Sequence, residues 1–145
     1  MKQQHFDVGT VGFYGAYWAC AGGSDCAVIA MIGDDPEDRL ARSAVKWLCG
    51  RGVNVLTMSP AKKDYGHHNY PLERVETAIS WLKANGNHKI GIAGASTTGT
   101  LALTAAAMFP DVTLTIAMTP SDFVWQGFMQ GKRDGCKEWP VEDES

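Results

Sequence analysis

The sequence predicts a single α/β domain, in which helices cover a mostly parallel β-sheet. Short runs rich in β-branched residues alternate along the chain with longer amphipathic runs, which is typical of parallel strands joined by helices. The chain has 145 residues, of which 45% are hydrophobic and 20% charged, so it is long enough to bury one core. We find no internal repeat and no change of composition that would mark a domain boundary.

The first half of the chain is expected to form several strands and one helix. Residues 8–18 are rich in glycine and aromatic residues and predict one or two opening strands. The apolar run 26–33 predicts a strand that is buried on both faces. The run VNVLTM, residues 53–58, predicts the strand after that.

A helix is expected between the last two of these strands. Asp35 is a candidate N-cap, Pro36 would take the first helical position, and Gly50 or Gly52 would end the helix. Its inner face is predicted from the helical spacing of four apolar residues: Leu40, Ala44, Trp47 and Leu48.

In the second half, a polar loop over residues 59–70 leads to a helix that opens at Pro71 and ends at Gly86. The inner face of that helix is predicted to carry Leu72, Val75, Ile79 and Leu82. The run KIGIAGA predicts a third buried strand, and VTLTIAM a fourth. A helix from Thr98 to Phe109 is expected between them, with one face formed by Leu101, Ala105, Met108 and Phe109. Residues from about 131 to 145 are expected to form a loosely ordered tail.

The run GASTTG, which contains Ser96, lies between an apolar run and a helical run. This is the place of a nucleophile elbow, whose strained backbone requires small residues on both sides of the nucleophile. Gly94 meets the first requirement, whereas Thr98 occupies the second position and Gly99 follows it. The N–H of Thr97 would point to the space above Ser96, where an oxyanion would form. We therefore take Ser96 as the candidate nucleophile and Thr97 as a candidate oxyanion donor.

Two other interpretations of this run are open. Ser96 could simply cap the helix expected at Thr98, which is a common role for serine. The pattern G-A-S-x-x-G is also similar to the phosphate turn of NAD(P)-binding short-chain dehydrogenases, with Asp122 as the ribose-binding acid. Against the dehydrogenase, two strand–helix units precede this turn, and Asp122 lies beyond the tip of the next strand.

A second oxyanion donor would come from the loop after the early buried strand. Gly33 would let the backbone approach a substrate closely, so Gly33 and Asp34 are the candidate backbone donors. The acidic side chains of Asp34 and Asp35 would oppose an oxyanion if they pointed inward. Capping of the following helix is an equally good role for them.

A serine nucleophile needs a base to take its proton. In this type of hydrolase the acid and then the histidine follow the nucleophile along the chain, but no histidine follows Ser96. His67 and His68 lie in the polar loop, and neither His5 nor His88 is well placed to act as the base.

Composition argues against several other classes of protein. A net charge of -3 and the absence of a basic stripe argue against binding to nucleic acid or to an anionic membrane. No signal peptide and no long apolar run is evident, so a cytoplasmic location is expected. The four cysteines form no C-x-x-C pair, and we expect reduced thiols, no metal site and no cofactor.

Four segments resemble the α/β-hydrolase domain of acyl-CoA thioester hydrolases and bile acid-CoA:amino acid N-acyltransferases: GVNVLTMSP, PLERVETAISWL, IGIAGASTTGTLAL and FPDVTLTIAMTPSDFVWQGF. They are similar, more distantly, to dienelactone-hydrolase-like enzymes. The resemblance extends over most of the chain. It implies an α/β-hydrolase-type sheet with flanking helices, and thioester or ester hydrolysis through an acyl-enzyme.

The resemblance also implies roles for particular residues. Ser96 falls on the nucleophile, the Thr97 N–H on one oxyanion donor, and the Gly33–Asp34 turn on the other. The acyltransferases carry cysteine at the nucleophile position, so a serine favours hydrolysis over transfer. The substrate would be a small-molecule acyl thioester or ester.

The family's acid and histidine lie beyond the part of the domain that this chain matches. We therefore expect a partial α/β-hydrolase domain, truncated after the strand that follows the elbow and inactive on its own. The alternative is a non-catalytic binding or interaction module with the same fold. In either case we expect an exposed edge near residues 112–128, which would associate with another chain or with a missing C-terminal portion.

Overall fold

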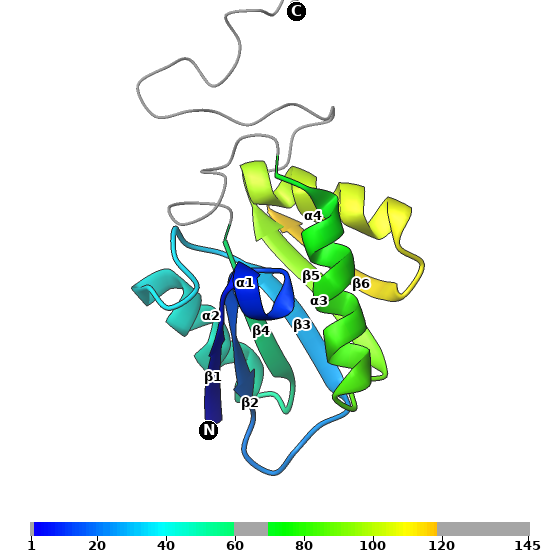
Figure 1. Ribbon diagram of the computed structural model, residues 1–145. Coiled ribbons are helices and arrows are strands. Elements are labelled where there is room, and N and C mark those ends of the chain that lie inside the picture. The colour runs from blue at the N-terminus through cyan, green and yellow to red at the C-terminus, as the bar shows by residue number, and fades with distance from the viewer. Residues whose placement is uncertain (1, 60–69, 119–145) are drawn as a thin grey trace, which may run out of the picture.

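The computed structural model describes residues 2–59 and 70–118, and Figure 1 shows their arrangement around one sheet. Within these residues the sheet has six strands, in the order β1-β2-β4-β3-β5-β6. Their bounds are Lys2–Phe6 (β1), Gly15–Ala19 (β2), Cys26–Met31 (β3), Asn54–Met58 (β4), Lys89–Ala95 (β5) and Val112–Met118 (β6). The last four match the strands predicted from the apolar runs, and β2 overlaps the range 8–18 in which one or two opening strands are predicted.

The sheet is mixed but mostly parallel. Strands β3, β4, β5 and β6 pair in parallel, whereas β1 pairs antiparallel with β2, and β2 antiparallel with β4. All four parallel strands point the same way, so the loops that follow β3 and β5 emerge at the same edge of the sheet. The predicted architecture, a mostly parallel sheet with flanking helices, is confirmed.

In the part of the chain that the structure describes, four helices accompany the sheet: Val8–Val11 (α1), Arg39–Cys49 (α2), Leu72–Ala84 (α3) and Thr97–Met108 (α4). Helices α3 and α4 lie over one face of the sheet, and α2 lies over the other (Figure 1). Each face therefore has its own core. The larger core joins Ile29, Leu56 and Ile92 of the sheet to Val75 and Leu82 of α3. The smaller one joins Val28 and Val55 to Val45 of α2.

The opening of the chain differs from the prediction. Residues 8–11 form the short helix α1, and the strand begins only at Gly15. The turn into α1 is fixed by Asp7, whose carboxylate accepts the Thr10 N–H at 3.1 Å. Strand β1 carries no hydrophobic signal because it lies at the sheet edge with Gln3, Gln4 and His5 exposed.

Helix α2 begins later than predicted and buries a different face. Its N-cap is Asp38 rather than Asp35, and Pro36 lies in the turn before the helix. The helix ends at Cys49 with Gly50 as its cap, as expected. The buried residues are Ala41, Val45 and Leu48. Two residues predicted to be inside are instead exposed at the surface, Leu40 by 62% and Trp47 by 54%. The Trp47 ring packs under the Arg51 guanidinium, 4.1 Å from its centroid.

Helix α3 buries most of its predicted face, whereas helix α4 buries a different face from the predicted one. Helix α3 follows Pro71 and buries Val75, Ile79 and Leu82 as predicted, while Leu72 is half-buried. Helix α4 turns a face of small residues to the sheet, and its buried residues are Thr98, Gly99, Thr100, Ala102 and Ala105. Of the predicted α4 face only Ala105 is fully buried, and Met108 is 57% exposed. Residues 60–69 of the expected polar loop 59–70, and the whole expected tail, lie outside the described residues.

Candidate active site

Ser96 lies in a sharp turn between β5 and α4, at the edge of the sheet where parallel strands end. Its backbone has φ 55° and ψ −118°, and it is the only non-glycine residue with positive φ in the described part of the chain. A serine held in this region costs of the order of 1–3 kcal/mol, and such strain is concentrated at functional sites. The side chain of Ser96 makes no capping hydrogen bond to α4. Capping therefore does not explain this serine.

The turn is possible because glycine allows three backbone segments to approach closely. A Cβ on Gly94 would overlap the Thr98 carbonyl, where the strand meets the first turn of α4. A Cβ on Gly99 would lie 3.0 Å from the Met118 carbonyl oxygen, at the end of β6. The same Met118 oxygen accepts the N–H of Ser96 at 2.8 Å. Gly99 thus serves the contact between α4 and β6, which explains a glycine one place later than in the usual elbow.

Thr98 occupies the position of the second elbow glycine and has a defined structural role. It is 4% exposed, and its hydroxyl oxygen accepts the Ala95 N–H at 2.9 Å. The hydroxyl hydrogen is directed to the carbonyl oxygens of Met31, at 2.6 Å, and Ala95, at 2.9 Å. With one hydrogen, the hydroxyl can serve one of these two acceptors at a time. Thr98 therefore links the carboxyl ends of β3 and β5.

All four predicted site residues line one open cavity of about 240 Å³. Ser96 and Thr97 come from the turn into α4, and Gly33 and Asp34 come from the β3–α2 loop. The remaining lining residues are Met31, Ile32, Leu40, Ala95 and Thr98. Thr97 is the first residue of α4, so its N–H has no acceptor within the helix. The partial positive charge of that helix end favours an anion beside Ser96.

The Gly33–Asp34 turn is organised around the carboxylate of Asp38. One oxygen of Asp38 accepts the Asp34 N–H at 2.7 Å and the Asp35 N–H at 3.2 Å, and the other accepts the Ala41 N–H at 2.9 Å. Gly33 has φ +96°, and a Cβ there would overlap the Asp38 carboxylate. Burial acts to raise the pKa of Asp38, but these N–H donors outweigh it together and hold the pKa below its ordinary value. The Asp34 N–H is thus already engaged, so an oxyanion at this turn would have to share it or use Gly33.

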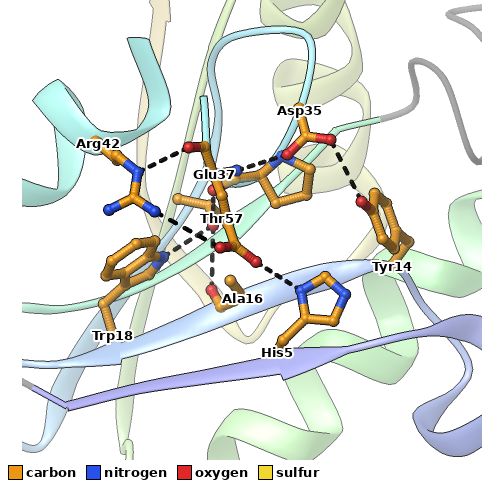
Figure 2. A network of polar contacts seen from close by, with 9 residues as sticks. His5, Tyr14, Ala16, Trp18, Asp35, Glu37, Arg42 and Thr57 are labelled. Carbon is orange, nitrogen blue, oxygen red and sulfur yellow. Dashed lines mark hydrogen bonds and ion pairs between the residues drawn. The ribbon is translucent and has the colours of Figure 1, made fainter. Parts of the chain in front are cut away.

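A network of side chains holds the outer side of this loop against β1, β2 and β4 (Figure 2). The Tyr14 hydroxyl donates to Asp35 Oδ2 at 3.3 Å, and Nδ1 of His5 lies 2.7 Å from Glu37 Oε2. The Thr57 hydroxyl donates to the Pro36 carbonyl at 2.7 Å. Burial, followed by the nearby Asp35 charge, raises the pKa of Tyr14, so its hydroxyl keeps its proton as a donor. The loop is therefore fixed on the side that faces away from the cavity.

No histidine lines the cavity in the described part of the chain. His5 pairs with Glu37 on the other side of the loop, and His88 precedes β5, at the opposite end of that strand from Ser96. His67, His68 and Asp122 lie outside the described residues. Within residues 2–59 and 70–118, no three His, Cys, Asp or Glu side chains gather as a metal site would require.

None of the helices in the described ranges is long and apolar enough to cross a membrane.

Two solved structures share the fold of this chain. An esterase from Pyrococcus furiosus aligns with a TM-score of 0.58 and 21% identity, over 74% of this chain and 45% of its own. Est1E from Butyrivibrio proteoclasticus, solved with ferulic acid bound, aligns with a TM-score of 0.62 and 20% identity, over 92% of this chain and 61% of its own. This chain has an α/β-hydrolase-type fold and spans about half the length of these two structures. No known family model and no curated protein matches it in sequence.

Sequence reasoning missed two residues that shape the cavity. The sequence does not single out Asp38 as the N-cap among the acids of GDDPED, although Asp38 alone directly precedes the first helical residue. For Thr98, the sequence shows only a residue other than glycine at the second elbow position. Its hydroxyl bonds to Met31, 67 residues earlier in the chain, and no local pattern reports a contact of that range.

Proposed function

We propose that this chain belongs to a serine hydrolase that acts on acyl esters or thioesters, with Ser96 as the nucleophile. The observation that carries the proposal is the strained backbone of Ser96, at the mouth of a cavity and beside the free end of a helix. Local sequence does not account for φ 55° at a serine, and the side chain does not cap the helix. The likeness to an esterase fold agrees with this chemistry without establishing it.

In the proposed reaction, Ser96 Oγ forms a bond to the carbonyl carbon of the substrate, and its proton passes to a general base. The carbonyl electrons move to oxygen, and the Thr97 N–H stabilises that charge together with a donor from the Gly33–Asp34 turn. The tetrahedral species then expels an alcohol or thiol, which takes a proton, and leaves an ester on Ser96. Water hydrolyses that ester and restores the serine. The base would come from residues beyond the described part of the chain.

The first test is labelling by a fluorophosphonate probe, applied to the longest natural form of the protein. We expect the probe to modify Ser96, and Ser96→Ala to abolish the labelling because no other group occupies the nucleophile position. Peptide mass spectrometry would locate the modified residue. Thr104→Ala is a suitable control, because its hydroxyl bonds only within α4, to the Thr100 carbonyl at 2.9 Å. Labelling that survives in Ser96→Ala would remove Ser96 from the nucleophile role.

The substrate is best proposed as an acyl thioester or ester of a small molecule. The cavity wall includes Met31, Ile32 and Leu40, which suit an apolar acyl group. Comparison of hydrolysis rates for acyl-CoA thioesters and for simple aryl esters would separate the two substrate classes. Because no histidine follows Ser96 within these 145 residues, and in this type of hydrolase the histidine follows the nucleophile, we expect negligible turnover from the 145-residue chain alone.

A second candidate function is a binding module that pairs with another chain, and the outer strand favours it. Strand β6 pairs with β5 on one side and ends the sheet of described residues on the other. Leu114 is 55% exposed and Met118 is 44% exposed, and both lie on the face where Ile116 joins the smaller core. An exposed strand with apolar side chains is a ready surface for another chain.

Association through β6 predicts that Leu114→Lys combined with Met118→Lys weakens a complex at least about tenfold, because two charges would replace buried apolar contacts. Sedimentation or size-exclusion with light scattering would measure the change. Leu103→Lys is the matched control, since Leu103 is 43% exposed on α4 rather than on the strand. A stable, well-folded monomer at high concentration would argue against this second function.

A further inference from the structure

The hydroxyl of Thr98 lies where two chain segments separate to form the cavity. Met31 and Gly94 are the last paired residues of β3 and β5. Beyond this pair, one segment turns through Ile32 and Gly33 and the other through Ser96, and residues of both segments line the same cavity.

The contacts of Thr98 reach both segments at this point. Its oxygen accepts the N–H of Ala95, the residue before Ser96. Its single hydrogen has two acceptors, the Met31 carbonyl at 2.6 Å and the Ala95 carbonyl at 2.9 Å, and the shorter of these contacts is the one that reaches across to Met31, the residue before Ile32. A glycine at position 98 has no side chain and could make neither contact. The elbow of this chain is therefore held by a side-chain hydroxyl at a position where the usual pattern has no side chain.

We propose that Thr98 is a positioning residue, whose hydroxyl fixes the separation between the Ser96 nucleophile and the Gly33 turn. The proposal rests on the proposed hydrolase function, because only a reacting group at Ser96 gives that separation a catalytic meaning. Thr98 is 4% exposed, so water cannot readily replace the two hydrogen bonds. If the hydroxyl is lost, the Ala95 N–H and the Met31 carbonyl can find new partners only if the two strand ends shift.

The test uses a probe that needs no catalytic base. Ser96→Cys places a thiol at the nucleophile position, and a thiol beside a helix N-terminus has a lowered pKa and reacts as the thiolate. We would follow its alkylation by iodoacetamide between pH 6 and 10, with peptide mass spectrometry to separate it from the native cysteines. The pH profile gives the apparent pKa of the introduced thiol, which depends on its place relative to the Thr97 N–H.

Thr98→Val, added to Ser96→Cys, keeps the shape of the side chain and removes the hydroxyl. We expect alkylation at neutral pH to slow about tenfold and the apparent thiol pKa to rise, since one to two hydrogen bonds of ordinary strength are lost. Hydrogen exchange at the Ala95 amide should become faster by a similar factor. Thr98→Ser, which keeps the hydroxyl, should restore both values. Val75→Ala, a cavity-forming change in the larger core, controls for loss of stability alone and should leave the thiol pKa unchanged.

An unchanged thiol profile in Thr98→Val would overturn the proposal, and so would an equal change in Thr98→Ser, because the hydroxyl would then not be the cause. If Thr98→Val does not fold, Thr98→Ala removes the same hydroxyl without adding bulk and is judged by the same criteria. Failure of the fluorophosphonate to label Ser96 would remove the hydrolase function but not this geometric role. The two results can therefore be told apart.

Discussion

Gly94→Ala is expected to destabilise the protein by about 3 kcal/mol, because the added methyl would overlap the backbone of α4. The obstructing atom is the carbonyl oxygen of Thr98, which belongs to the helix backbone and cannot rotate away as a side chain would. Relief requires the first turn of α4 to move off β5, and that movement would strain the Ser96 N–H bond to Met118. Urea unfolding followed by circular dichroism would measure the loss.

Gly86→Ala is the matched control for this change. Gly86 has φ +89° but nothing within 4 Å of the position where a Cβ would stand. Its cost should be only the conformational penalty of alanine at positive φ, about 1 kcal/mol. Equal losses in the two variants would mean that α4 adapts easily, and the close packing at the elbow would then not hold its geometry.

Asp38→Ala is expected to cost about 2 kcal/mol at neutral pH, because three backbone N–H groups lose their common acceptor. Part of the loss is recovered by water, since the loop is only half-buried. Asp38→Asn should lie between the wild type and the alanine variant, since an amide offers one acceptor in place of two. Asp111→Ala is the control: its exposed ion pair with Lys83 contributes at most about 1 kcal/mol.

The effect of Asp38 should depend on pH in a defined direction. Its pKa is lower in the folded protein than in the unfolded chain, so its contribution is complete above the unfolded value of about 3.9. The stabilising contribution of the Asp38 carboxylate is lost as the pH falls through its lower pKa in the folded protein. The difference in unfolding free energy between wild type and Asp38→Ala should thus be full at pH 7 and shrink in acid. A difference that stays constant down to pH 2 would contradict the proposed role of the carboxylate.

Most of the architecture follows from local patterns, because buried parallel strands are continuous apolar runs. For this reason the sequence predicts the strands β3, β4, β5 and β6. Patterns failed where tertiary contacts decide the outcome. The inner face of α2 is set by Ala41, whose small side chain allows close contact with the sheet, and the larger Leu40 and Trp47 remain outside. Ala41, Val45 and Leu48 also have helical spacing, so periodicity alone does not choose between the two faces.

The candidate site shows the same limit. GASTTG is a local motif. Gly33 and Asp34 can be located from the sequence because they come directly after the apolar run that predicts β3. The sequence could therefore place Ser96, Thr97, Gly33 and Asp34 at one edge of the sheet, and they do share a cavity. The sequence could not show which of the backbone N–H donors are already hydrogen-bonded within the protein. The Asp34 N–H donates to a carboxylate four residues away. Only the three-dimensional structure shows which of the neighbouring acids carries that carboxylate.

The elbow at Ser96 also has a consequence for the order in which this protein folds. Its unfavourable backbone angles are compensated by Met31, 67 residues before Thr98, and by Met118, 22 residues after Ser96. An isolated β5–α4 segment contains neither acceptor, so it would relax to ordinary angles. We therefore expect Ser96 to enter its strained conformation only after β3 and β6 have joined β5, and loop closure over such separations is slow. On this expectation the cavity forms late in folding, when distant strands are already in register.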